Sequence, residues 1–173
     1  MKYINFALLT ALFLIPQTVS YAARSASVTV DVSVTIRPVF ELSVSGPANG
    51  NIEFGEVDKK LDETVVAESE KVFVTAKSNL REPYIISHSL QSPLRSISGS
   101  TMPDDSMTVT ARSFNTNGRP ADNQTVNTNS SVLFESDANG MGDTVEAQYQ
   151  LKVASNQDSG TYNSKLTYSI VTA

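Results

Sequence analysis

The chain has 173 residues, with 18 acidic and 13 basic side chains, one histidine, and no cysteine or tryptophan. This length suits one domain with a real core, while the lack of cysteine excludes disulfides, thiolate metal sites and cysteine nucleophiles. A single histidine excludes a multi-histidine metal site, and the net charge of −5 argues against a nucleic-acid partner, because nucleic-acid binders usually carry a basic patch.

Residues 1–22 have the pattern of a secretory signal peptide. Lys2 supplies the positive start, an apolar run extends from Phe6 to Ile15, and Pro16 ends it. Ser20 and Ala22 place small residues where signal peptidase reads the chain, so we expect cleavage after Ala22. The apolar run is too short for a typical transmembrane helix, although an uncleaved anchor is the alternative.

Residues 23–37 form a segment that we call the arm. Its β-branched residues alternate without interruption with small, polar or charged residues, and Pro38 follows directly. Because proline cannot donate to a β-ladder, a central strand should end there. The arm is either the first strand of its own domain or a donor strand that completes the sheet of a neighbouring subunit, because strand addition is an established recognition mode. The side chains that would carry assembly are Val28, Val30, Val32, Val34 and Ile36.

The remaining residues, 38–173, predict one all-β domain. Apolar residues alternate with polar ones in short segments separated by Gly, Pro, Asn, Asp and Ser, and no helical periodicity of useful length appears. This pattern is typical of an antiparallel β-sandwich or barrel. The expected strands cover residues 40–44, 52–57 with a bulge near Gly55, 72–76, 84–90, 107–111, 132–134, 145–153 and 162–170.

Three segments look like loops. Residues 113–131 are rich in Asn, Thr and Gly and predict a mobile, exposed excursion. The acidic stretch 62–70 predicts a solvated loop. Asp137 to Asp143 weakly resembles a calcium loop, but the closing glutamate is missing, so we interpret it as a plain turn.

No residue constellation predicts catalysis, a cofactor or a metal. His88 is in phase with Tyr84, Ile86 and Leu90, which favours a buried structural role over a ligand. Two acidic pairs are weak candidates for acid–base catalysis. Asp104 and Asp105 are adjacent, and adjacent residues of an extended chain point to opposite faces. Glu68 and Glu70 lie in the acidic stretch, which is most simply a solvated loop. The sequence therefore predicts a protein that is not an enzyme.

Both ends of the predicted domain resemble a known family. The run Val30 to Val44, V-D-V-S-V-T-I-R-P-V-F-E-L-S-V, is similar to the start of colonisation-factor-type fimbrial subunits, which are cysteine-free chaperone–usher pilins. The segment from Gly160 to Ile170 resembles the last strand of such subunits. The resemblance implies an incomplete immunoglobulin-like antiparallel β-sandwich that a neighbour's arm completes. Gly160, Tyr162, Leu166, Tyr168 and Ile170 would border the receiving groove.

The same resemblance implies partners and a location. A periplasmic chaperone and an outer-membrane usher would handle the exported subunit, which would join identical or related fimbrial subunits at the cell surface. A host or surface receptor is not indicated by any motif.

A second resemblance leaves an alternative open. Asn51 to Val57, with its I-x-F-G-x-V pattern, and the closing G-T-Y-x-x-x-L-x-Y pattern are similar to secreted β-sandwich surface modules of the WxL type, although the Trp-x-Leu motif itself is absent. The alternative function is a secreted or cell-surface binding module that does not polymerise.

Overall fold

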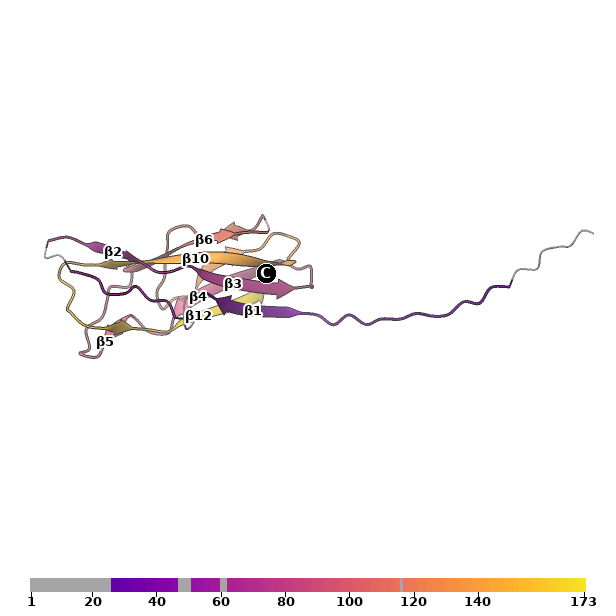
Figure 1. Cartoon of the computed structure of the whole chain (residues 1–173), viewed down its shortest axis with the longest axis horizontal. Coiled ribbons are helices and arrows are strands. Elements are labelled where there is room, and N and C mark those ends of the chain that lie inside the picture. Colours follow the sequence, from indigo (N-terminus) through magenta and orange to yellow (C-terminus); the bar gives the residue numbers. More distant parts are fainter. Residues whose placement is uncertain (1–25, 47–50, 60–61, 116) are drawn as a thin grey trace, which may run out of the picture. The chain divides into compact units, whose positions relative to one another are not determined.

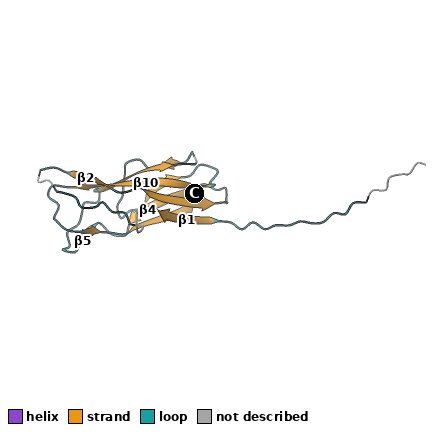
Figure 2. Cartoon of the chain, viewed as in Figure 1, coloured by secondary structure: helices purple, strands orange, loops and turns teal. Residues whose placement is uncertain are grey.

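The computed structural model describes residues 26–46, 51–59, 62–115 and 117–173. The predicted signal peptide lies outside the described residues. The chain divides after Thr35 into two units, and each is considered by itself. The described residues form antiparallel strands and loops with no helix (Figure 2), which confirms the predicted all-β class. Within these residues, therefore, no helix has the length and apolar character needed to cross a bilayer.

The larger sheet is built around one long strand. β10 (Gly142–Val153) pairs with β3 (Val72–Ser78) on one side and with β6 (Met107–Ser113) on the other. β3 also pairs with β1 (Phe40–Ser45), so that β3 lies between β1 and β10 (Figure 1). β2 (Val65–Glu68) pairs with the end of β10, and β8 (Gln124–Thr125) pairs with β6. In the order of this sheet β1 is an edge strand.

The second sheet contains the C-terminal strand. Its order is β12 (Leu166–Thr172), β4 (Tyr84–Leu90), β9 (Ser131–Glu135) and β7 (Arg119–Pro120). A separate two-stranded ladder joins β5 (Arg95–Ser96) to β11 (Tyr162–Asn163). β12 has β4 as its neighbour in this sheet, so β12 is also an edge strand.

The core lies between the inner faces of the two sheets. β3 and β4 show strict alternation of buried and less buried residues, as their sequence pattern predicts. The largest buried side chains include Tyr84, Phe134 and Tyr149. Both Leu133 and Phe134 are fully buried, because the β4–β9 pairing shifts register between Ile86 and Ser87. This bulge departs from simple alternation.

The turn before β10 confirms one sequence prediction. The main-chain N–H groups of Asn139 and Gly140 donate to the Asp137 carboxylate, at 2.9 and 3.3 Å. Asp137 thus closes a local turn. Gly142 then begins β10 with φ of +91°, and a Cβ there would lie 2.8 Å from the carbonyl oxygen of Ala76. A glycine is required at this position both by the backbone conformation and by the close approach of β3.

Several predicted boundaries were wrong. The expected excursion 113–131 contains β7 and β8, and its Val126 is only 1% exposed, so this segment is partly anchored in the core. The acidic stretch 62–70 contains β2. Residues 52–57 belong to no strand, and the expected strand 162–170 is divided into β11 and β12, which pair with different partners. Short strands with little apolar content have weak sequence patterns, so pairing with a neighbour decides them.

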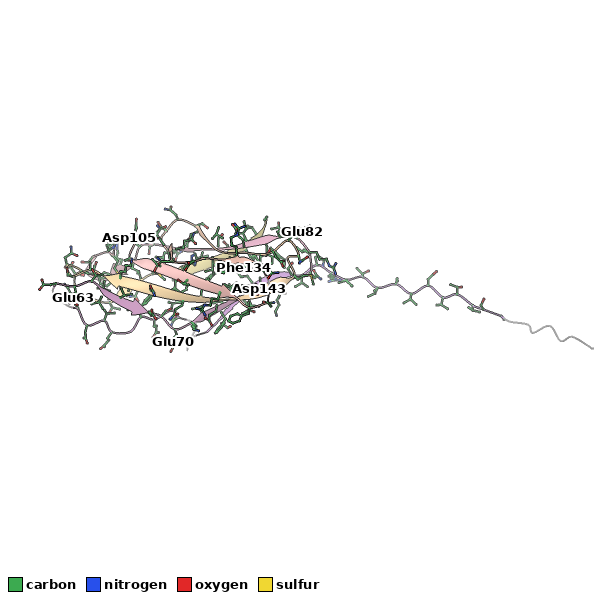
Figure 3. All side chains as sticks on the ribbon, turned by 90° about the horizontal axis from the view of Figure 1, so that it is seen from above. Glu63, Glu70, Glu82, Asp105, Phe134 and Asp143 are labelled. Atoms are coloured by element: carbon green, nitrogen blue, oxygen red, sulfur yellow. The ribbon has the colours of Figure 1, made fainter. Side chains whose placement is uncertain are left out.

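Phe134 should be a major contributor to the stability of this core. Phe134, which Figure 3 labels, is fully buried. Its ring lies 6.3 Å from that of Tyr84. We expect Phe134→Ala to lower the free energy of unfolding by about 3–5 kcal/mol, because the substitution leaves a cavity. Phe114→Ala is the matched control, since Phe114 is 62% exposed, and it should change stability by less than about 0.5 kcal/mol. Equal losses in urea denaturation would contradict this assignment of the core.

Candidate binding groove

The edge strands β1 and β12 present apolar residues that neither sheet fully covers. In β12, Leu166, Tyr168 and Ile170 are half-buried, and the residues between them are exposed. In β1, Phe40 and Leu42 are half-buried and Val44 is exposed. A fully enclosed sandwich would bury these positions, so the two edges form an incompletely covered side of the core.

The main chain of β12 is also available at this side. Gln91 N–H donates to the carbonyl of Lys165, and Ala173 N–H donates to that of Pro83, at 2.7 and 2.8 Å. In an antiparallel ladder alternate residues bond to the same neighbour, so the odd-numbered residues of β12 face β4. The N–H and C=O groups of Leu166, Tyr168 and Ile170 therefore point to the outer edge, and their side chains turn towards the core. A strand added at this edge would find both hydrogen-bonding groups and apolar contacts.

Two adjoining cavities lie along this side, and we call them together the edge groove. Their volumes are about 530 and 670 Å³, and they share lining residues from the segment 51–59 and from the turn before β12. The first cavity is lined mainly by apolar side chains: Val44, Ile52, Phe54, Val72, Leu90, Leu94, Met107, Leu166 and Tyr168. The polar residues that also line it are Ser45, Asn51, Glu53, Asn163, Ser164 and Lys165. A pocket that combines apolar walls with polar groups is typical of a binding site.

The structure places most of the predicted groove residues along the edge groove. Leu166 and Tyr168 line the first cavity, whereas Gly160 and Tyr162 line the second. Ile170 lines neither cavity, although it continues the half-buried face of β12. Sequence reasoning missed the contributions of Leu94, Met102 and Met107, which come from β6 and from loops remote in sequence. Only their apolar character in polar surroundings could have indicated them.

The five predicted assembly residues of the arm are exposed. Their side chains have between 75% and 93% of their surface accessible, and residues 26–39 belong to no strand. Isolated exposed apolar residues are ordinary, but five of them on alternate positions of one segment form an extended apolar stripe.

A buried polar network lies beneath the first cavity. The Tyr149 hydroxyl is 2.8 Å from the Tyr168 hydroxyl and 3.0 Å from Nδ1 of His88. Burial lowers the pKa of His88 to about 4 and raises the pKa of Tyr168 to about 12. Nε2 of His88 is buried without a hydrogen-bond partner. His88 is therefore held neutral in the core, as its phase on the strand predicts.

The remaining candidates for chemistry have structural surroundings. Glu68 accepts hydrogen bonds from the side-chain amides of Gln148 and Gln150, at 3.1 and 3.0 Å, which joins β2 to β10. Asp104 and Asp105 lie in an exposed turn before β6. Among the residues that the structure describes, no group of three or more His, Asp or Glu is arranged to hold a metal ion. These arrangements supply hydrogen bonds between strands and solvated charge.

Comparison with known proteins adds no family assignment. No protein-family model matches the chain, and no curated protein matches it.

The burial of His88 predicts a pH dependence of stability. Its folded pKa of about 4 lies below the ordinary value of 6.5, so between these values the unfolded chain binds a proton that the folded chain does not. The free energy of unfolding should therefore fall by about 3 kcal/mol from this group as the pH drops from 6.5 to 4. Below about pH 3, where His88 is protonated in both the folded and the unfolded chain, this contribution should stay constant.

Urea unfolding of the wild type and of His88→Gln between pH 7 and pH 4 tests this. Since the chain has one histidine, the fall between pH 6.5 and pH 5 isolates this group from the carboxylates. In His88→Gln the free energy of unfolding should not show the decrease between pH 6.5 and pH 5 that His88 causes in the wild type. If the free energy of unfolding depends on pH in the same way in both proteins, protonation of His88 does not destabilise the fold, which would contradict this prediction.

Proposed function

We propose that this protein is a structural subunit of a bacterial fimbrium, in which the arm of one copy occupies the edge groove of another. The observation that carries the proposal is a complementarity within one chain. The arm is an unpaired segment with an apolar stripe, and the groove has an apolar floor beside an unpaired strand edge. The arm would cover the apolar groove and pair with the free strand edge, and the groove would bury the apolar stripe of the arm.

The pairing would use both the main chain and the side chains. Leu166, Tyr168 and Ile170 offer their N–H and C=O groups at every second residue. An added strand that bonds to these groups directs alternate side chains into the groove, and Val and Ile occupy alternate positions of the arm. Full burial of one such side chain contributes about 1.5–3 kcal/mol, so several together would make a durable joint.

The resemblance to cysteine-free chaperone–usher pilins supports the same proposal. It implies an immunoglobulin-like topology and export through the inner membrane. It also implies a periplasmic chaperone, an outer-membrane usher and a final place in the fimbrium on the cell surface. The lack of cysteine fits a subunit whose stability comes from a neighbouring copy, because small secreted domains otherwise often rely on disulfides.

Removal of the arm should separate assembly from folding. We expect the chain from Ala23 to form oligomers in light scattering and the chain from Pro38 to be monomeric and less stable, because its groove stays empty. A synthetic peptide of residues 26–37 should raise the melting temperature of the shorter chain. If the shorter chain is as stable as the longer one and both are monomeric, the protein is a self-contained module, which is the alternative function.

The apolar stripe of the arm should be required for assembly, and its opposite face should not be. We expect the double substitution Val32→Asp and Val34→Asp to abolish oligomers, because two carboxylates would be buried without partners. The matched control is Ser33→Asp with Thr35→Asp, which adds the same charge on the polar face and should still assemble. Export of both variants, measured in the periplasmic fraction, should equal that of the wild type. Equal assembly of the two variants would refute the insertion of the stripe into the groove.

A further inference from the structure

Arg37, the last residue of the arm, and Val39 are held by a group of hydrogen bonds to Asn79 that we call the clasp. The side chain of Asn79, which directly follows β3, accepts a hydrogen bond from Val39 N–H at 2.7 Å and donates one to the carbonyl of Arg37 at 3.0 Å. The main-chain N–H of Asn79 also donates to the carbonyl of Val39, at 3.2 Å. Three hydrogen bonds from one residue thus hold Arg37 and Val39 on either side of Pro38.

The clasp continues the pairing of β1 beyond the end of β3, which ends at Ser78. Val39 lies opposite Asn79, and the Asn79 side chain bonds to the N–H of Val39 and the carbonyl of Arg37 in place of main-chain groups of a longer β3. Pro38, between them, fixes its own φ near −65° and leaves no N–H at the outer edge of β1. Arg37, at the root of the arm, is therefore held in line with β1.

The direction of β1 relative to β12 decides whether the arm can enter the groove of its own chain without reversing. Phe40, at the start of β1, packs edge-on against Tyr84, which is opposite Thr172 at the end of β12. Val44, near the end of β1, lines the first cavity together with Leu166, at the start of β12. β1 and β12 thus run in opposite directions along the groove. An arm that entered the groove of its own chain would have to turn back at residues 36–39 and run alongside β1.

Such a reversal is incompatible with the clasp. A two-residue hairpin at Arg37-Pro38 needs a positive φ at Arg37, and in the commonest type at both residues, which neither residue favours. A wider turn that includes Val39 would break the hydrogen bonds to Asn79. Reversal therefore requires both the loss of the clasp and an unfavourable backbone conformation.

We propose that Asn79, together with Pro38, is a positioning device that prevents the arm from filling the groove of its own chain and so directs it to a second copy. This inference rests on the proposed function, because it assumes that the arm binds an edge groove. Asn79 acts through the root of the arm and touches neither cavity of the groove. Asn79 affects whether the arm occupies the groove of its own chain or the groove of a second copy.

A cross-linking experiment can measure this choice directly. The chain has no native cysteine, so Ser33→Cys on the polar face of the arm and Val171→Cys, 55% exposed in β12, give each chain one reactive thiol on the arm and one on β12. Chains with only one of the two cysteines identify the products that join like residues of two copies. A short bis-maleimide linker then joins the two residues within one chain or between two chains, and a denaturing gel separates the products. In the otherwise native chain from Ala23 we expect products between chains.

In Pro38→Gly with Asn79→Ala, the ratio of the within-chain to the between-chain product should rise about tenfold, the order of magnitude of losing one or two hydrogen bonds. Asn79→Asp keeps the acceptor for Val39 N–H and loses the donor to Arg37, so it should give an intermediate ratio. Asn139→Ala is the matched control, because the Asn139 side chain bonds to Asp137 away from the arm and should leave the ratio unchanged. Thermal unfolding of each variant separates loss of the fold from a change in the ratio.

The outcomes separate the two proposals. An unchanged ratio in the double variant overturns the role of Asn79 and leaves the proposed function in place. Mainly within-chain product in the native background refutes both, because the arm would then fill the groove of its own chain. Absence of any cross-link between arm and β12 in the native background refutes the proposed function, and with it this inference.

Discussion

The unpaired outer edge of β12 is the constraint on which the rest of the structure depends. A strand edge that carries half-buried apolar residues costs free energy twice, through unpaired main-chain groups and through partly hydrated side chains. The sandwich leaves this edge open beside β1 and lines it with apolar residues of both sheets. The same chain carries an unpaired segment with the matching periodicity. In the proposed function these two features belong to different copies, and the arm of one copy covers the edge of the next.

The core beneath this edge is held without covalent cross-links. β10 is paired along both sides, and the aromatic residues Tyr84, Phe134 and Tyr149 fill the space between the sheets. The hydroxyls of Tyr149 and Tyr168 link this core to the groove through a hydrogen bond. A buried polar network of this kind specifies one arrangement of the side chains, because each member loses its partner when a neighbour moves. The wall of the groove that Tyr168 forms is thereby fixed from below.

Alternation along the chain predicted the long strands β3, β4, β6 and β10 and the buried position of His88, because each has one face in the core and one towards solvent. Prediction from alternation failed for segments whose structure depends on pairing with a neighbouring strand. β7 and β8 contain two residues each and have no periodicity to detect. Residues 52–57 have the composition of a strand, yet they line the edge groove without joining a sheet. Burial of Val126 anchors a segment whose polar composition predicts a loop.

The sequence by itself determined the class of the fold, the apolar stripe of the arm and the residues of β12 that face the core, because side-chain direction in a strand follows directly from the order of residues. Only the tertiary structure decided that β1 and β12 are both edges, that they run in opposite directions, and that a cavity lies between the sheets there. Asn79 has no signal in the sequence, since its role depends on the register that brings it opposite Val39, forty residues away in the chain. Pairing between strands remote in sequence is a property of the folded chain, and local pattern contains no record of it.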